Sequence, residues 1–239
     1  LGTDVLRLWA GHQSPWEFSQ ADKEKLFADS KAAALAQRVW DARKELKYEP
    51  LTADEGIDAA LASDQFPVVL ADVADNPGGG GTCDAVYLLR RLIERDVQDV
   101  AVAAIYDPET VCQAVEAGVG ATIDVKIGGK VIPEVTGGPV CCKAYVKAIT
   151  DGKYRNSGPM FHGLMMDHGT LAVLQVGGVT VLVGKIRVQT WDLEVFRSCG
   201  ITPEKQKILV ICSFSAKSQR FSAPRDFHID LARLELCNY

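Results

Sequence analysis

The amino-acid sequence predicts an α/β fold, in which a parallel strand-helix-strand core at about residues 67–127 continues into a mixed, partly antiparallel β-rich half. Two observations predict this class. The apolar run at Val68–Val73 is short, β-branched and unbroken, as in a strand covered on both faces, and it leads through four glycines into a helix. From Gly128 onward, short β-rich segments separated by glycine and proline replace the helical pattern.

The first 62 residues are predicted to form an N-terminal helical segment. A long helix is expected from Asp22 to Leu46, because this stretch is rich in Ala, Leu, Lys and Glu and has no internal glycine or proline. Pro50 ends it. Thr52–Glu55 has the pattern of a capping box, which opens a short helix to Ala62.

The core is predicted from alternating strands and helices. A helix is expected over Ala85–Arg95, where apolar residues recur at helical spacing and Asp84 precedes the first turn. A second buried strand follows at Val100–Ile105. Asp107 caps the next helix, which has a proline in its first turn and ends at Gly118. With a strand up to residue 127, this order indicates parallel strands joined by helices.

The later half is predicted to add antiparallel strands to one continuous sheet. Gly177-Gly178 is expected to be the hairpin turn between two of these strands. A short helix, a second helix start at Thr202 and a last buried strand follow. The segments expected to be strands or helix are Lys143–Ala148, Leu171–Val176, Thr180–Val183, Trp191–Arg197 and Ile208–Cys212. We therefore expect one α/β domain at 63–212 and a tail at 213–239.

Composition excludes several classes of protein. The chain has 239 residues, 47% of them hydrophobic, which is enough to bury a core. A net charge of −5 argues against nucleic-acid binding. No apolar run reaches membrane-spanning length and no signal peptide is visible. Seven dispersed cysteines fit free thiols better than a disulfide framework. We expect a cytoplasmic protein with no membrane partner, and a homo-oligomer stays open.

The glycine turn is the candidate binding site. Glycines let backbone N–H groups approach a ligand, and a helix N-terminus adds positive partial charge. The spacing matches neither the dinucleotide fingerprint nor the P-loop, so a nucleotide is not expected. Local capping explains the same polar residues without a ligand. The residues predicted to bind a substrate group or an anion are Asp75, Asn76, Gly78, Gly79, Gly80, Gly81 and Asp84.

A metal site has little support in the sequence. There is no H-E-x-x-H, no C-x-x-C and no pair of histidines four residues apart on a helix. His162, Asp167 and His168 lie close together in a stretch rich in glycine and methionine, and they are the candidate metal ligands. Histidines scattered over loops more often pack or face solvent.

Several segments together carry a family resemblance. The most specific is the Asp-Asn-Pro-Gly-Gly-Gly run inside Val68–Asp84, and further matching segments continue to Gly200-Ile201-Thr202-Pro203. From about residue 30 to residue 210 the chain resembles the C-terminal domain of the microcystinase C (MlrC)-like metallopeptidases. The family's last strand usually continues into a Lys-Ser and His-Phe-Arg pattern, and Cys212–Phe221 departs from it. The role of that family histidine is therefore not carried over.

The resemblance implies the accessory, cleft-forming half of a zinc metallopeptidase that hydrolyses amide bonds in small or linear peptides. In the full-length family enzyme, His, Asp and Glu side chains of a larger N-terminal domain hold the zinc. The expected partners are thus a small peptide substrate and this missing N-terminal catalytic domain. We expect the present chain alone to have no cofactor and no activity. Backbone N–H groups of Gly78–Gly81 would bind a substrate carboxylate or oxyanion, which Asp75 or Asn76 would orient.

Two other functions stay open. The chain is alternatively a non-catalytic binding or assembly module that uses the Asp-Asn-Pro-Gly-rich turn to bind an anion. Magnesium-dependent phosphoryl chemistry at Asp72, Asp75 and Asp84 would use hard oxygen ligands, but a positioned lysine or arginine is missing from the pattern.

Overall fold

The chain divides into two units, residues 1–49 and 50–239, in a computed structural model that describes residues 21–45, 51–212 and 228–231. The first unit contains helix α2 (Ala21–Asp41), which confirms a long helix in the predicted stretch but ends before Leu46, and the turn η2 (Ala42–Lys44) that follows it. Leu46 and Pro50, where the predicted helix was expected to end, lie outside the described residues. The guanidinium of Arg43 lies 4.3 Å from the centre of the Trp40 ring and donates a hydrogen bond to the Trp40 carbonyl. None of the described helices is long and apolar enough to cross a membrane.

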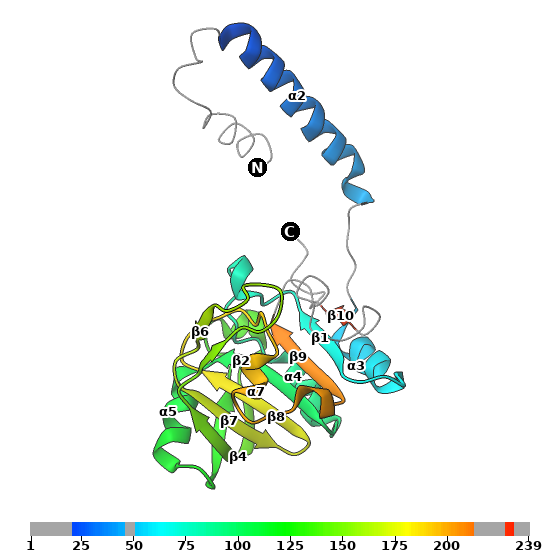
Figure 1. Ribbon diagram of the computed structural model, residues 1–239. Coiled ribbons are helices and arrows are strands. Elements are labelled where there is room, and N and C mark those ends of the chain that lie inside the picture. The colour runs from blue at the N-terminus through cyan, green and yellow to red at the C-terminus, as the bar shows by residue number, and fades with distance from the viewer. Residues whose placement is uncertain (1–20, 46–50, 213–227, 232–239) are drawn as a thin grey trace. The chain divides into compact units, whose positions relative to one another are not determined.

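The second unit contains the sheet and the remaining helices (Figure 1). Its helices and turns are α3 (Ala53–Ala62), η3 (Pro77–Gly79), α4 (Tyr87–Glu94), α5 (Pro108–Ala117), α6 (Pro133–Thr136), α7 (Glu194–Arg197) and η4 (Pro203–Lys205). Its strands are β1 (Val68–Asp72), β2 (Val100–Tyr106), β3 (Thr122–Ile127), β4 (Val140–Thr150), β5 (Lys153–Arg155), β6 (Met165–Asp167), β7 (Leu171–Val176), β8 (Val179–Gly184), β9 (Ile208–Cys212) and β10 (His228–Leu231).

The predicted α/β class is confirmed by a mixed eight-stranded sheet, in the order β10-β1-β9-β2-β8-β7-β4-β3. The first five strands of this order pair in parallel, and the last three continue the sheet through antiparallel pairs. Strands β5 and β6 form a separate two-stranded sheet. The hairpin predicted at Gly177-Gly178 joins β7 to β8.

The parallel core differs from the sequence expectation in which strands it contains. Strand β9 lies between β1 and β2, so the first two predicted strands are not neighbours. Strand β3, expected as the third parallel strand, pairs antiparallel with β4 at the far edge. Its more exposed and more buried residues alternate, whereas every residue of β2 except Tyr106 is buried. Such alternation is typical of a strand with one solvated face.

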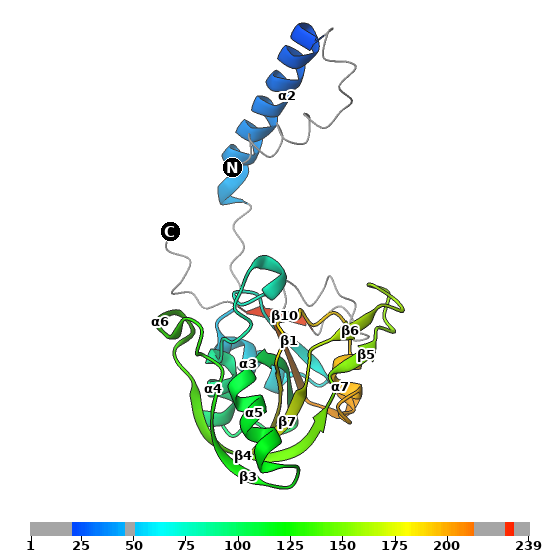
Figure 2. The ribbon, with the colours of Figure 1, turned by 90° about the vertical axis from the view of Figure 1, so that its left-hand side faces the viewer.

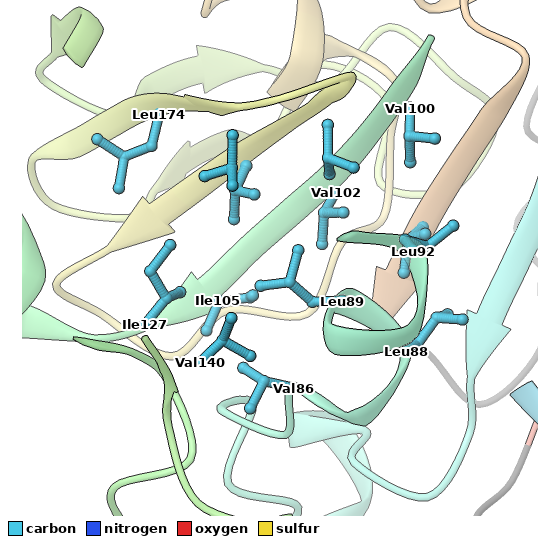
Figure 3. Packing of buried hydrophobic residues seen from close by; sticks show 14 of the residues in the cluster. Val86, Leu88, Leu89, Leu92, Val100, Val102, Ile105, Ile127, Val140 and Leu174 are labelled. Carbon is cyan, nitrogen blue, oxygen red and sulfur yellow. The ribbon is translucent and has the colours of Figure 1, made fainter. Parts of the chain in front are cut away.

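Helices cover one face of the sheet and a smaller set of elements covers the other (Figure 2). On the first face, α3, α4 and α5 bury apolar side chains such as Ile57, Leu89 and Val111. On the second face, Phe196 of α7 packs with Tyr154 of β5 and residues of the central strands. Figure 3 shows Leu88, Leu89 and Leu92 of α4 against the sheet strand β2. Packing of α4 on β2 holds the start of this helix close to the sheet edge.

The predicted helix signals are confirmed at α3 and α5. The Thr52 hydroxyl accepts a hydrogen bond from the Glu55 backbone N–H, while the Glu55 carboxylate accepts from the Thr52 backbone N–H, as in a capping box. Asp107 caps α5 by accepting from the Thr110 N–H, and Gly118 ends that helix with a positive φ of 82°.

Candidate functional site

The carboxyl ends of the parallel strands meet at one edge of the sheet, where the loop after β1 lies. Open α/β sheets bind ligands outside the carboxyl ends of their strands. This loop spans residues 73–86 and contains the turn η3. Together with residues from three helices it lines a pocket of about 220 Å³. We refer to this cavity as the edge pocket.

Asp75 holds the loop in its closed shape from within. One carboxylate oxygen, Oδ1, accepts hydrogen bonds from the Thr82 hydroxyl at 2.9 Å and from the Cys83 N–H at 2.8 Å. The other oxygen, Oδ2, accepts from the Ala85 N–H at 2.7 Å. The side chain is 5% exposed, and burial raises its pKa against the opposing effect of these hydrogen bonds. Asp75 therefore organises the loop, and both of its oxygens are occupied.

The glycine turn uses its own backbone N–H groups internally. Gly78 donates to the Asn76 side-chain oxygen at 3.0 Å. Gly79 and Gly81 donate to the Asn76 carbonyl at 3.0 and 2.8 Å, and Gly80 donates to the Pro77 carbonyl at 3.1 Å. Pro77 starts a 3-10 turn that directs these groups inward. The predicted capture of an anion by the four N–H groups does not fit this geometry.

Glycine is required at two positions of the turn. Gly80 has a φ of 93°, in the left-handed region that favours glycine. A Cβ atom on Gly81 would lie 2.6 Å from the Asp75 carbonyl carbon. Gly79 has neither constraint, since a Cβ there would have its nearest neighbour at 3.6 Å. The glycines thus let the chain close tightly around Asn76.

Asp84 ties this loop to a distant segment and does not cap α4. Its Oδ2 accepts hydrogen bonds from the N–H groups of Lys130 and Val131, each at 2.8 Å, and the side chain is fully buried. Helix α4 begins at Tyr87, with Val86 at the N-cap and no side-chain cap. The prediction that Asp84 caps the following helix is therefore wrong, because its hydrogen-bond donors lie 46 and 47 residues away.

The edge pocket has apolar walls and one acidic corner. Ala53 of α3, Tyr87 and Leu88 of α4, and Ile132 and Val135 at α6 form the walls. Their convergence was not predicted, because they come from three segments far apart in the sequence. Among the residues that the structure describes, the lining holds two carboxylates, Asp72 and Asp75, and no lysine, arginine or histidine.

Asp72 is the carboxylate with remaining hydrogen-bonding capacity. Its Oδ1 accepts from the N–H groups of Ala74 and Asp75, at 3.1 and 3.3 Å. Its Oδ2 receives no hydrogen bond within the described part of the chain. Burial, and secondarily the negative charge of Asp75, raise the pKa of Asp72 to about 6. A carboxyl group in this state accepts or releases a proton near neutral pH.

The predicted metal ligands are engaged separately. His168 is fully buried and its Nε2 lies 3.0 Å from the Tyr154 hydroxyl oxygen, while burial lowers its pKa to about 4. Asp167 accepts from the Gly169 N–H, and His162 Nδ1 lies 2.9 Å from the Ser157 carbonyl oxygen. Within the ranges that the structure describes, no three His, Cys, Asp or Glu residues are grouped so that they could hold a metal ion. These residues therefore do not fit a zinc site.

The positions of Asp72, Asp75 and Asp84 do not support magnesium-dependent phosphoryl chemistry. Asp75 and Asp84 direct their carboxylates at backbone N–H groups of the fold. Lys130, whose backbone N–H donates to Asp84, has its ammonium group 2.9 Å from carboxylate oxygens of both Asp107 and Glu109. Asp72, Asp75 and Asp84 thus do not converge on one cation.

The fold and the edge pocket define an α/β domain that presents a glycine-containing loop at the carboxyl edge of its sheet. The sequence model of the family described as MlrC C-terminus matches residues 70–225. The chain belongs to this family, as its Asp-Asn-Pro-Gly-Gly-Gly segment indicated.

Two relatives show how much of a longer protein the chain spans. Microcystinase C from Sphingomonas sp. is 29% identical over 157 residues, which cover 66% of this chain and 30% of the relative. The crystal structure of a candidate metallopeptidase from Mesorhizobium sp. BNC1 has the same fold, with a TM-score of 0.71 at 24% identity. That match covers 83% of this chain and 39% of the other. The chain thus spans about a third of the length of these relatives.

Proposed function

We propose that this chain is the accessory, cleft-forming part of a metallopeptidase that hydrolyses amide bonds in small or linear peptides. Membership of the MlrC C-terminus family and the name of the Sphingomonas relative support the peptidase class. The observation that carries the proposal is the edge pocket, which lies at the sheet edge where α/β folds bind ligands. In this proposal the pocket contacts part of the peptide.

In this proposal the loop residues do not bind the substrate through their backbone N–H groups. Asp75, Asn76 and Gly78–Gly81 shape the wall of the cleft, because their polar groups are used inside the loop. Asp72 offers the substrate a carboxylate oxygen. The loop is thus a rigid frame, and Asp72 is the polar contact that it supports.

The metal and the bond cleavage belong, in this proposal, to a partner domain. The described residues supply no ligand set for zinc. The relatives are about three times as long as the segment that this chain matches, so a separate catalytic domain has room in them. When bound there, zinc would activate the attacking water. The present chain contributes substrate contacts and excludes water from one side of the cleft.

A chimera tests this proposal. The matched 157-residue segment of microcystinase C would be replaced by the corresponding part of this chain, and cleavage of a linear peptide would be measured. We expect turnover that a chelator abolishes and zinc restores. Asp72→Asn in the chimera should raise KM more than it lowers kcat, while the matched control Asp124→Asn, on exposed strand β3, should change neither. A chimera that folds cooperatively and binds zinc but cleaves no peptide would contradict the proposal.

A further inference from the structure

The apolar walls and the small volume of the edge pocket limit the kind of ligand that it can bind. Its apolar walls come from α3, α4 and α6, and two of its wall side chains, Tyr87 and Ile132, are 38% and 43% exposed. Exposed apolar side chains around a concavity mark a site that an apolar group can cover. The cavity of about 220 Å³ is smaller than the roughly 300–1,000 Å³ of pockets for drug-sized ligands. It therefore suits one side chain or a group of that size.

Of the four carboxylate oxygens in the described lining, one accepts no hydrogen bond from the described residues. Asp75 accepts three hydrogen bonds, one of them from the Thr82 hydroxyl. The Thr136 hydroxyl donates to the Ile132 carbonyl. Asp72 uses Oδ1 for two backbone N–H groups, and among the described residues nothing donates to Oδ2. Asp72 Oδ2 is thus a carboxylate oxygen in the pocket with capacity to accept a hydrogen bond from a ligand.

The negative charge of the pocket lining favours a ligand with a positive charge. Asp72 and Asp75 are both carboxylates, and none of the described residues that line the cavity is cationic. An anion would meet repulsion from both groups without a compensating donor. A cation would neutralise Asp72 where burial makes an uncompensated charge costly. A bare metal ion does not fit, because no three ligating side chains are grouped among the described residues.

We propose that the edge pocket binds a protonated amine that carries an apolar group about the size of one amino-acid side chain. The ammonium group donates to Asp72 Oδ2, and the apolar group packs between Leu88, Ile132 and Val135. The N-terminal residue of a peptide and a free amine both have this chemistry. The proposal reverses the ligand charge predicted from the glycine turn, because the pocket beside the turn is acidic and the N–H groups of the turn are occupied.

Direct binding to the 239-residue chain tests this proposal without any catalytic step. Calorimetric titrations at pH 7.5 would compare leucinamide with N-acetyl-leucinamide, which lacks the charge, and with glycinamide, which lacks the apolar group. We expect leucinamide to bind at least tenfold more tightly than either. Leu-Gly-Gly and 3-methylbutylamine distinguish the two sources: equal affinities indicate that a free amine suffices, and tighter binding of the peptide indicates a peptide N-terminus.

Variants assign the binding to the pocket. Asp72→Asn keeps an acceptor oxygen for the Ala74 and Asp75 N–H groups but removes the charge, and should weaken leucinamide binding at least tenfold. Ile132→Ala removes an exposed wall side chain and should weaken leucinamide but not glycinamide. Asp124→Asn, outside the pocket, should have no effect. Equal affinity for leucinamide and N-acetyl-leucinamide, or unchanged affinity in a folded Asp72→Asn chain, would overturn the proposal. A chimera that still cleaves peptide would then leave the proposed function standing.

Discussion

The carboxylate of Asp75 accepts a hydrogen bond from the backbone N–H of Ala85, ten residues further along the chain, at 2.7 Å. This bond closes the loop that carries the four glycines and brings the start of α4 to the edge of the sheet. With the bonds from Thr82 and Cys83, it makes Asp75 the internal anchor of the edge pocket. Asp75, the aspartate of the Asp-Asn-Pro-Gly-Gly-Gly segment, therefore has a structural role in the loop.

Asp75→Asn should destabilise the fold. An amide nitrogen in place of either carboxylate oxygen would face an N–H or hydroxyl donor, and a buried donor without an acceptor costs about 1–3 kcal/mol. We expect the free energy of unfolding in urea to fall by that amount. The control Asp124→Asn loses only an exposed ion pair and should change it by less than about 0.5 kcal/mol. An unchanged urea midpoint for Asp75→Asn would show that its carboxylate does not anchor the loop.

Alanine substitutions at Gly79 and Gly81 should have different effects. At Gly81 the new Cβ would lie 2.6 Å from the Asp75 carbonyl carbon, a backbone atom that cannot move aside cheaply. We expect a loss of about 1–3 kcal/mol, typical of overpacking. At Gly79 the nearest atom would be 3.6 Å away, so the effect should stay within about 0.5 kcal/mol. Thermal unfolding of both variants checks this order, and equal melting temperatures would contradict the described turn.

Asp72→Asn should stabilise the chain above pH 6. Asp72 has its pKa raised from 3.8 to about 6, so the folded state holds this proton more tightly than the unfolded state. The contribution of Asp72 to stability is therefore lost as pH rises from about 4 to about 6. The variant lacks this penalty and should be more stable by on the order of 1–2 kcal/mol at pH 7.5, with the gain shrinking toward pH 4.

The comparison with wild type is essential for this pH prediction. Burial lowers the pKa of His168 to about 4, so its contribution is lost in the opposite direction, as pH falls from 6.5 to about 4. The two effects oppose each other in the wild-type profile. The difference between Asp72→Asn and wild type removes the His168 contribution, which both share. A difference that does not change with pH would refute the raised pKa of Asp72.

Alkylation rates of the cysteines should follow their burial. Cys112 and Cys141 are exposed and should react first with iodoacetamide, whereas Cys83, Cys199 and Cys212 are buried and should react slowly. A hydrogen bond with Cys83, and then burial, raise the pKa of Cys212 and keep it in the unreactive thiol form. Peptide mapping by mass spectrometry measures these rates. All seven cysteines should label after denaturation without reductant, and a disulfide would contradict the prediction of a cytoplasmic protein.

Much of the fold was predictable because its signals are local. The capping box at Thr52, the Asp107 cap and the β-branched run at Val68 each act within a few residues. Strand order is not local: β9 enters between β1 and β2 only once the whole sheet is formed. The alternation of polar and apolar residues over Thr122–Ile127 was a usable signal that this strand has one exposed face.

Local sequence signals account for only part of the candidate site. The glycine turn was predictable because turn residues are local signals, and Gly80 and Gly81 line the edge pocket. That this loop binds a ligand stays a prediction. Whether an N–H group faces a ligand depends on the path of the turn, and Asn76 and Pro77 accept the bonds instead. Ala53 and Ile132, which contribute apolar walls, lie far from Asp72 along the chain, so no local pattern predicts that the three residues meet.

The most direct test is an NMR titration of a linear peptide, with a free N-terminus and a leucine first, into the 239-residue chain in the presence of zinc. We expect the leucine resonances to broaden while the peptide stays intact, because in the proposed function this chain binds substrate and a partner domain cleaves it. Product resonances that vanish with a chelator would place the catalytic metal in this chain and contradict the account. Unbroadened leucine resonances would contradict its role as the wall of the substrate cleft.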